Sequence, residues 1–259
     1  METKTLLSLT LMVAMLVSHH IAAVAPPKVF SATAANAIGL EAVTELFEDK
    51  LGGVNNENNP GPLTTGYREI NWDAPIVPFN MPGNFFRATV TRGLQVIAKQ
   101  GKFAVSNDPN THDNRFSTFL GQYPGIFKTF SPQRLFTPVL ENKMWIRFFV
   151  PGTNKALGQN LPALVRGFGI IFTDVDFYGK TKLILFDQYD RKIGVYNAQP
   201  KNNGLTFLGV ILEKTDPRGI KRVRVILGNA KVGFRDGAAY DVVTMDNFFY
   251  GEPIAVSHW

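Results

Sequence analysis

After residue 62 the chain consists largely of short apolar or alternating segments separated by Gly, Pro, Asn and Asp. In KRVRVIL, for example, Val223, Val225 and Leu227 alternate with Arg222 and Arg224. This repeat of two places the apolar side chains on one face of a strand, which is typical of an antiparallel sheet with one solvated face. About nine such segments predict an all-β fold, an antiparallel two-sheet β-sandwich of jelly-roll type. An up-and-down barrel is the alternative.

One segment before these strands has helical periodicity. In GLEAVTELFEDKLGG, Val43, Leu46, Phe47 and Leu51 fall on one helical face, and two glycines follow. We expect one short N-terminal helix that covers an edge of the β structure. Residues 40–254 contain no break in composition strong enough for a second domain, so we expect a single β-sandwich domain there.

The N-terminus has the pattern of a secretory signal. A lysine precedes the apolar run LLSLTLMVAMLVS, and small residues follow in IAAVA. The run is shorter than the roughly 20 residues that a membrane-spanning helix needs. We therefore expect a signal peptide over 1–25, cleaved after Ala25 or its rivals Ala23 and Ala34, and a linker over 26–39. An uncleaved anchor is the alternative. The mature protein would be secreted, without stable membrane insertion.

The composition limits the chemistry of the chain. It has no cysteine, which excludes disulfides, thiol nucleophiles and thiolate zinc sites. Only His112 and His258 follow the expected signal, and the sequence has no Gly-x-Ser-x-Gly motif for a serine hydrolase. We expect no catalytic residues, although a carboxylate-based glycan hydrolase or lyase remains an alternative.

Basic side chains outnumber acidic ones, with a formal net charge of +6. They are scattered along the chain, so the excess serves either solubility or attraction to anionic polysaccharide, cell wall or membrane surface. Nucleic acid is not an expected partner, because export and the scattered charge both argue against it.

The segment GYREINWD combines aromatic and polar residues. Arg68, Glu69, Trp72 and Asp73 could line a sugar-binding site, since aromatic faces stack on sugars and polar groups bind hydroxyls. In the alternative, Trp72 covers the edge of the core and Arg68 pairs with an acid.

Two carboxylates end the apolar run GFGIIFTDVD. Asp174 and Asp176 are two residues apart, so on a regular strand they share a face, where two unpaired buried charges would be costly. A calcium ion is one solution, because it prefers oxygen ligands, and Asp246 near the last strand is a further candidate ligand. Alternatively, the strand end emerges into water and pairs with Lys180 or Lys182.

Four motifs resemble those of a group of exported, largely uncharacterised proteins, mostly bacterial. They are REINWDAP, TFSPQRLFTPV, GFGIIFTDVD and VVTMDNFFYGEP, and the likeness extends over residues 40–253. Two positions depart from the pattern of the group: Ala74 replaces a usual Gly, and Asn247 replaces a usual Asp beside Asp246. The resemblance implies export and a single β domain, and it brings no known activity.

These observations favour a secreted, non-catalytic protein that binds carbohydrate or a cell-surface polymer, steadied by structural calcium. A structural or matrix protein without a small ligand is the second hypothesis, and a carboxylate-based glycan-active enzyme is the third.

Overall fold

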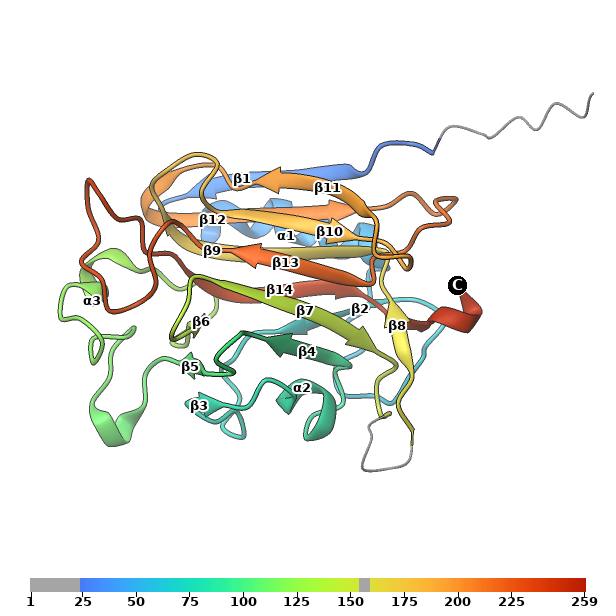
Figure 1. Cartoon of the computed structure of the whole chain (residues 1–259), viewed down its shortest axis with the longest axis horizontal. Helices are drawn as coiled ribbons and strands as arrows, with labels where there is room; N and C mark the ends of the chain where they lie inside the picture. The colour runs from blue at the N-terminus through green and yellow to red at the C-terminus, as the bar shows by residue number, and fades with distance from the viewer. Residues whose placement is uncertain (1–23, 154–158) are drawn as a thin grey trace, which may run out of the picture.

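The computed structural model describes residues 24–153 and 159–259. In these ranges two antiparallel β-sheets pack face to face (Figure 1). The first sheet runs in the order β1 (Lys28–Ala34), β12 (Lys201–Ile211), β9 (Gly167–Val175), β14 (Thr244–Gly251), β6 (Phe136–Pro138), β5 (Phe103–Val105) and β3 (Asn80–Met81), with β2 (Tyr67–Ile70) also paired to β14. The second runs β11 (Lys192–Asn197), β10 (Lys182–Phe186), β13 (Arg222–Ile226), β7 (Lys143–Phe149), β8 (Pro162–Leu164) and β15 (Ile254–Ala255), with β4 (Leu94–Ile97) paired to β7.

Helical segments are few. The one long helix is α1 (Ile38–Leu51), and the others described are single turns: α2 (Phe85–Ala88), α3 (Tyr123–Ile126) and 3-10 turns at Pro109–Thr111 and Val256–His258. The predicted all-β two-sheet sandwich with one short N-terminal helix is thus confirmed. An up-and-down barrel would place consecutive strands side by side, whereas here β9 lies between β12 and β14, and β13 between β10 and β7. No helix of the described ranges is both long enough and apolar enough to cross a membrane.

The main core lies between the two sheets. Phe168, Ile170 and Phe172 of β9 face Val223 and Val225 of β13 within one buried cluster. The alternate residues of β13 point outward, as the sequence pattern predicts, whereas every residue of β9 is buried. The strand β9 is apolar on both faces because α1 covers the outer face of the first sheet (Figure 1).

A pair of glycines receives the helix. Gly169 of β9 and Gly209 of β12 lie opposite each other, and the ring of Phe47 from α1 rests on them. A Cβ atom at Gly209 would lie 2.5 Å from the Phe47 ring, and one at Gly169 would lie 2.9 Å from it. The two glycines therefore let the helix approach the backbone of the sheet closely.

The prediction of a linker over residues 26–39 is wrong in its central part. Residues 28–34 form β1, which pairs along its whole length with β12, from Lys28 opposite Ile211 to Ala34 opposite Leu205. Most of its side chains are exposed or half-exposed, and Phe30, Ala32 and Ala34 face the apolar cluster beneath α1. Its backbone pairs with β12 at the edge of the sheet, and the Phe30 ring packs edge-on against the Phe47 ring of α1, with 5.3 Å between centroids.

A third, smaller apolar cluster lies beside the sandwich. Phe116, Tyr123 and Phe127 from the long aromatic segment before β6 pack there against Val232 and Val242 from the segment between β13 and β14. This contact fixes the segment that leads into β14. That segment carries two of the carboxylates described below.

Candidate functional site

Arg68 of the predicted sugar site is fully buried. Its side chain is 0% exposed, and its Nε and Nη2 donate to the Oε2 and Oε1 atoms of Glu252 at 2.8 and 2.9 Å. Its Nη1 donates to the carbonyl oxygens of Glu57 and Thr91. The guanidinium therefore has no free donor pointing to solvent, and the alternative reading, in which Arg68 pairs with an acid, is correct.

Trp72 is also part of the core, with 1% of its surface exposed. Its ring stacks on Phe136 with 4.0 Å between centroids, and its indole Nε1 donates to the carbonyl oxygen of Asp246 at 2.8 Å. A ring buried to this extent cannot stack on a sugar. Since Arg68 is buried as well, the prediction of ligand binding by Arg68 and Trp72 is wrong.

Glu69 and Asp73 are half-buried, and both bind neighbouring chain segments. The Glu69 carboxylate accepts from the Asn247 amide at 2.5 Å, and Asp73 accepts from the Ser131 hydroxyl at 2.8 Å. Burial raises the pKa of both carboxyls. The cavity beside Glu69 measures about 60 Å³, far below the roughly 300 Å³ at which small-molecule sites begin. These residues join β2 and its following loop to β14.

Asp246 belongs to this same network and not to the Asp174–Asp176 pair. It is 0% exposed, and its carboxyl contacts the backbone N–H of Phe130 at 2.6 Å and the Ser131 hydroxyl at 3.0 Å. Oxygens of Asp73 and Asn247 also lie within 2.8 Å of that hydroxyl. One hydroxyl supplies one proton and cannot donate to all three oxygens, and a protonated Asp246 carboxyl would supply a second donor. Burial raises the pKa of Asp246 well above its usual range, in agreement.

Asp176 is one of three carboxylates that come together at the end of β9. One oxygen from each of Asp176, Asp236 and Asp241 lies within 4.8 Å of the others. Sequence reasoning missed Asp236 as a member, because it lies on the segment between β13 and β14, where the third apolar cluster places it.

Asp174 lies beside this group. Its φ of 65° ends the regular alternation of the strand, and its side chain is buried, with Oδ1 accepting from the backbone N–H of Asn203 at 2.7 Å. Its Oδ2 is buried without a hydrogen-bond partner. Burial, then the charges of Asp236, Asp176 and Asp241, raise the pKa of Asp174 to about 7. The pKa of Asp241 rises to about 6, again mainly through burial. The predicted emergence into water is therefore wrong for Asp174.

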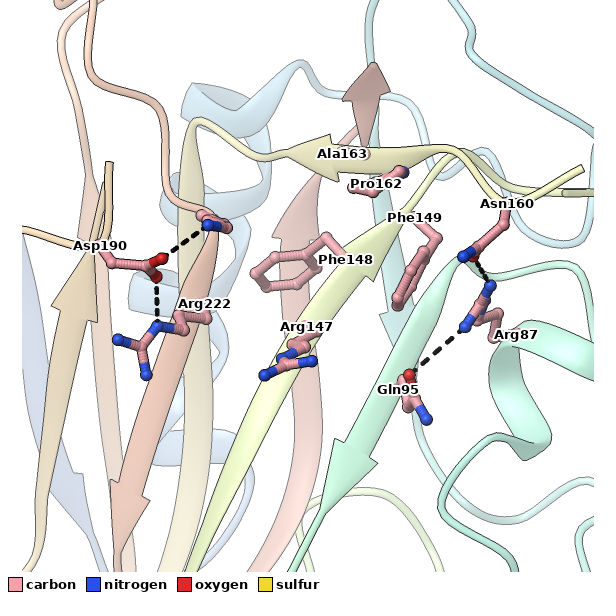
Figure 2. Close-up of a pocket in the computed structure, with 11 residues that line it drawn as sticks. Arg87, Gln95, Arg147, Phe148, Phe149, Asn160, Pro162, Ala163, Asp190 and Arg222 are labelled. Carbon is pink, nitrogen blue, oxygen red and sulfur yellow. Dashed lines mark hydrogen bonds and ion pairs between the residues drawn. The ribbon is translucent and has the colours of Figure 1, made fainter. Parts of the chain in front are cut away.

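A separate cavity of about 630 Å³ opens on the outer face of the second sheet (Figure 2). We call it the cationic pocket. Its lining consists of Arg87, Gln95, Arg147, Phe148, Phe149, Asn160, Pro162, Ala163, Asp190, Lys221 and Arg222. Four of these residues are cationic and one is anionic, a formal net charge of +3. None of the predicted site residues lies in it.

Strand register creates the centre of the cationic pocket. Arg147 of β7 lies opposite both Arg222 of β13 and Gln95 of β4, so the three side chains form a row across adjacent strands. They project outward because their neighbours Ile146 and Val223 point into the core. The alternating patterns seen in the sequence thus generate the pocket once the strands are paired.

The cations of the pocket differ in how they are held. Asp190 accepts from Lys221 Nζ at 2.8 Å and from Arg222 Nε at 2.7 Å, and these contacts lower its pKa. The Arg222 guanidinium also lies over the rings of Trp145 and Phe186, at 4.4 and 4.3 Å from their centroids. In Figure 2 it lies on one side of Arg147, whose guanidinium makes no hydrogen bond or ion pair with any described residue.

Arg87 forms the opposite wall. Its guanidinium stacks on the Phe149 ring, 3.5 Å from the centroid, and donates to the amide oxygens of Gln95 and Asn160. Its Nε is buried without an acceptor, and burial lowers its pKa. The pocket therefore offers anchored cations and one unpaired guanidinium to an anionic ligand.

Comparison with known proteins gives no match to a family model, to a curated protein or to a solved structure.

Proposed function

We propose that this protein is a secreted, non-catalytic binding protein for an anionic polysaccharide, and that the sugar carboxylates bind in the cationic pocket. The observation that carries the proposal is the excess of four cations over one carboxylate in a 630 Å³ cavity, with the Arg147 guanidinium unpaired. A cavity of this volume falls in the range of ordinary ligand sites.

The mixture of side chains suits a charged sugar better than a bare inorganic anion. Arg147 and Arg222 are neighbours on adjacent strands, so their guanidinium groups can each bind a carboxylate through two parallel hydrogen bonds. The amides of Gln95 and Asn160 can bind hydroxyls, and Phe149 provides an apolar surface beside them.

The pocket favours binding over hydrolysis. Glycoside hydrolysis commonly uses two carboxyl groups, one of them protonated, whereas the described lining contains Asp190 alone. Both oxygens of Asp190 face cations that lower its pKa, so it stays ionised and cannot act as a general acid.

The test is binding of the mature protein to polygalacturonate, a polymer of carboxylated sugars, with neutral dextran as the ligand control. Arg147→Gln should weaken binding by about tenfold or more, because a hydrogen-bonded charge contributes roughly 1.5–3 kcal/mol. The fold should be unaffected, since Arg147 is exposed and contacts no acid. Binding should also weaken as salt is added.

Lys50→Gln is the matched control, because it removes one exposed positive charge from α1. This helix covers the outer face of the first sheet, whereas the pocket lies on the outer face of the second. It should change the affinity less than twofold. Equal losses in Arg147→Gln and Lys50→Gln would mean that net charge alone attracts the polymer, and equal binding to dextran would remove the role of the carboxylates. Either result would refute the proposal.

A further inference from the structure

We propose that Asp176, Asp236 and Asp241, with Asp174 beside them, form a calcium site that joins the end of β9 to the segment leading into β14. The inference is independent of polysaccharide binding, since none of these residues lines the cationic pocket. It also differs from the ligand set that the sequence suggests, because Asp236 and Asp241 replace Asp246.

The separation of the carboxylate oxygens fits a single ion. One oxygen from each of Asp176, Asp236 and Asp241 lies within 4.8 Å of the other two. Calcium binds oxygen at about 2.3–2.6 Å, so ligands on opposite sides of the ion are about 5 Å apart. One ion can therefore contact all three side chains with little movement.

Unpaired buried oxygens provide the second, independent observation. Asp174 is 1% exposed, yet its Oδ2 has no hydrogen-bond partner, and the same holds for the buried Oδ1 of Asp176. Asp174 precedes Asp176 by two residues at the end of β9, and the charges of Asp236, Asp176 and Asp241 all act on its carboxyl. An unsatisfied buried carboxylate is costly, and a cation between these side chains would remove that cost.

No side-chain cation of the described ranges compensates the group. None of the ion pairs there involves Asp174, Asp176, Asp236 or Asp241, so Lys180 and Lys182 do not serve as the counter-charges that the sequence suggests. Carboxylates so close together must otherwise share protons. A bound cation and shared protons are thus the two physical solutions. Only in the first should added metal stabilise the fold.

Backbone contacts hold two of the ligands in place. Asp241 accepts from the N–H groups of Asp176 and Phe177 at 3.3 and 3.1 Å, and Asp236 accepts from the N–H of Val242 at 2.8 Å. The ligand atoms are all carboxylate oxygens and come from two segments, the end of β9 and the loop before β14. Such an irregular arrangement suits calcium better than magnesium, which demands near-octahedral geometry.

The test is thermal unfolding of the mature protein, first freed of metal with chelator and then returned to excess calcium or magnesium, together with calorimetric titration of calcium into the chelated protein. A ligand bound only by the native state should raise the Tm by about 5–10 °C when its concentration is a hundred times its Kd. No difference between chelator and calcium in Tm and no heat of titration would overturn the proposal, as would an equal shift with magnesium.

Variants locate the effect. Asp176→Asn should lose more than half of the calcium-induced rise in Tm, yet the chelated variant should melt no lower than the chelated wild type, because one repelling charge is gone. Asp49→Asn, an exposed carboxylate on α1, should keep the full calcium response. A full response in Asp176→Asn would place the calcium elsewhere and refute this ligand set.

Discussion

The buried pair between Arg68 and Glu252 should be among the most sensitive points of the fold. The two side chains are 0% and 3% exposed, and Glu252 also accepts from Asn56 Nδ2 at 2.9 Å and from the Leu63 N–H at 3.1 Å. Glu252→Gln keeps the shape but leaves the guanidinium buried without its counter-charge. It also turns an NH₂ group toward one of these donors. Removing one partner of a buried pair costs about 3–5 kcal/mol, a large part of the 5–15 kcal/mol that stabilises an ordinary domain.

The free energy of unfolding can be measured by urea denaturation, followed by the fluorescence of the three tryptophans. Glu213→Gln is the matched control, because it breaks the exposed pair with Lys28, whose side chains are 62% and 35% exposed, and should cost less than about 1 kcal/mol. The double variant Arg68→Met with Glu252→Gln should lose less than the sum of the two single variants, since no buried charge remains. The reasoning is refuted if Glu252→Gln costs no more than Glu213→Gln.

Two further changes test the packing and the buried acid. Gly209→Ala should destabilise the protein by about 1–3 kcal/mol, because the new methyl would lie 2.5 Å from the Phe47 ring, and a urea midpoint equal to that of the wild type would show that α1 shifts without cost. The raised pKa of Asp246 means that the folded protein holds a proton which the unfolded chain releases above about pH 4, so this residue makes stability fall as pH rises from there toward the folded pKa. Asp246→Asn cannot titrate and can still donate to Ser131, so its stability relative to the wild type should be greater at pH 8 than at pH 5; urea midpoints that change in parallel with pH would contradict this.

The fold could be predicted from the sequence where one face of a strand is buried and the other faces solvent. In β13, Val223 and Val225 are buried and Arg222 and Arg224 are not, as alternation requires. The edge strand β1 gives a weaker signal, because two of its three inward residues, Ala32 and Ala34, are small and most of its side chains stay exposed.

The sites depended more on tertiary contacts. The pairing of Arg68 with an acid was an open alternative. Its partner Glu252 lies near the other end of the sequence, and the two side chains meet only because β2 pairs with β14. Likewise, Asp176 was a predicted cation ligand, whereas Asp236 joins it through the packing of a loop. The cationic pocket needs the register between β7 and β13, which side-chain periodicity alone does not determine.

The position of β1 affects how an exported form of the chain would behave in solution. A leader cut after Ala23 or Ala25 leaves the strand whole, whereas a cut after Ala34 would remove all seven of its residues. The eleven-residue strand β12 would then present a long row of unpaired N–H and C=O groups at the margin of the first sheet. Such an edge recruits strands from other molecules, so the shorter product would self-associate and the longer one would stay monodisperse.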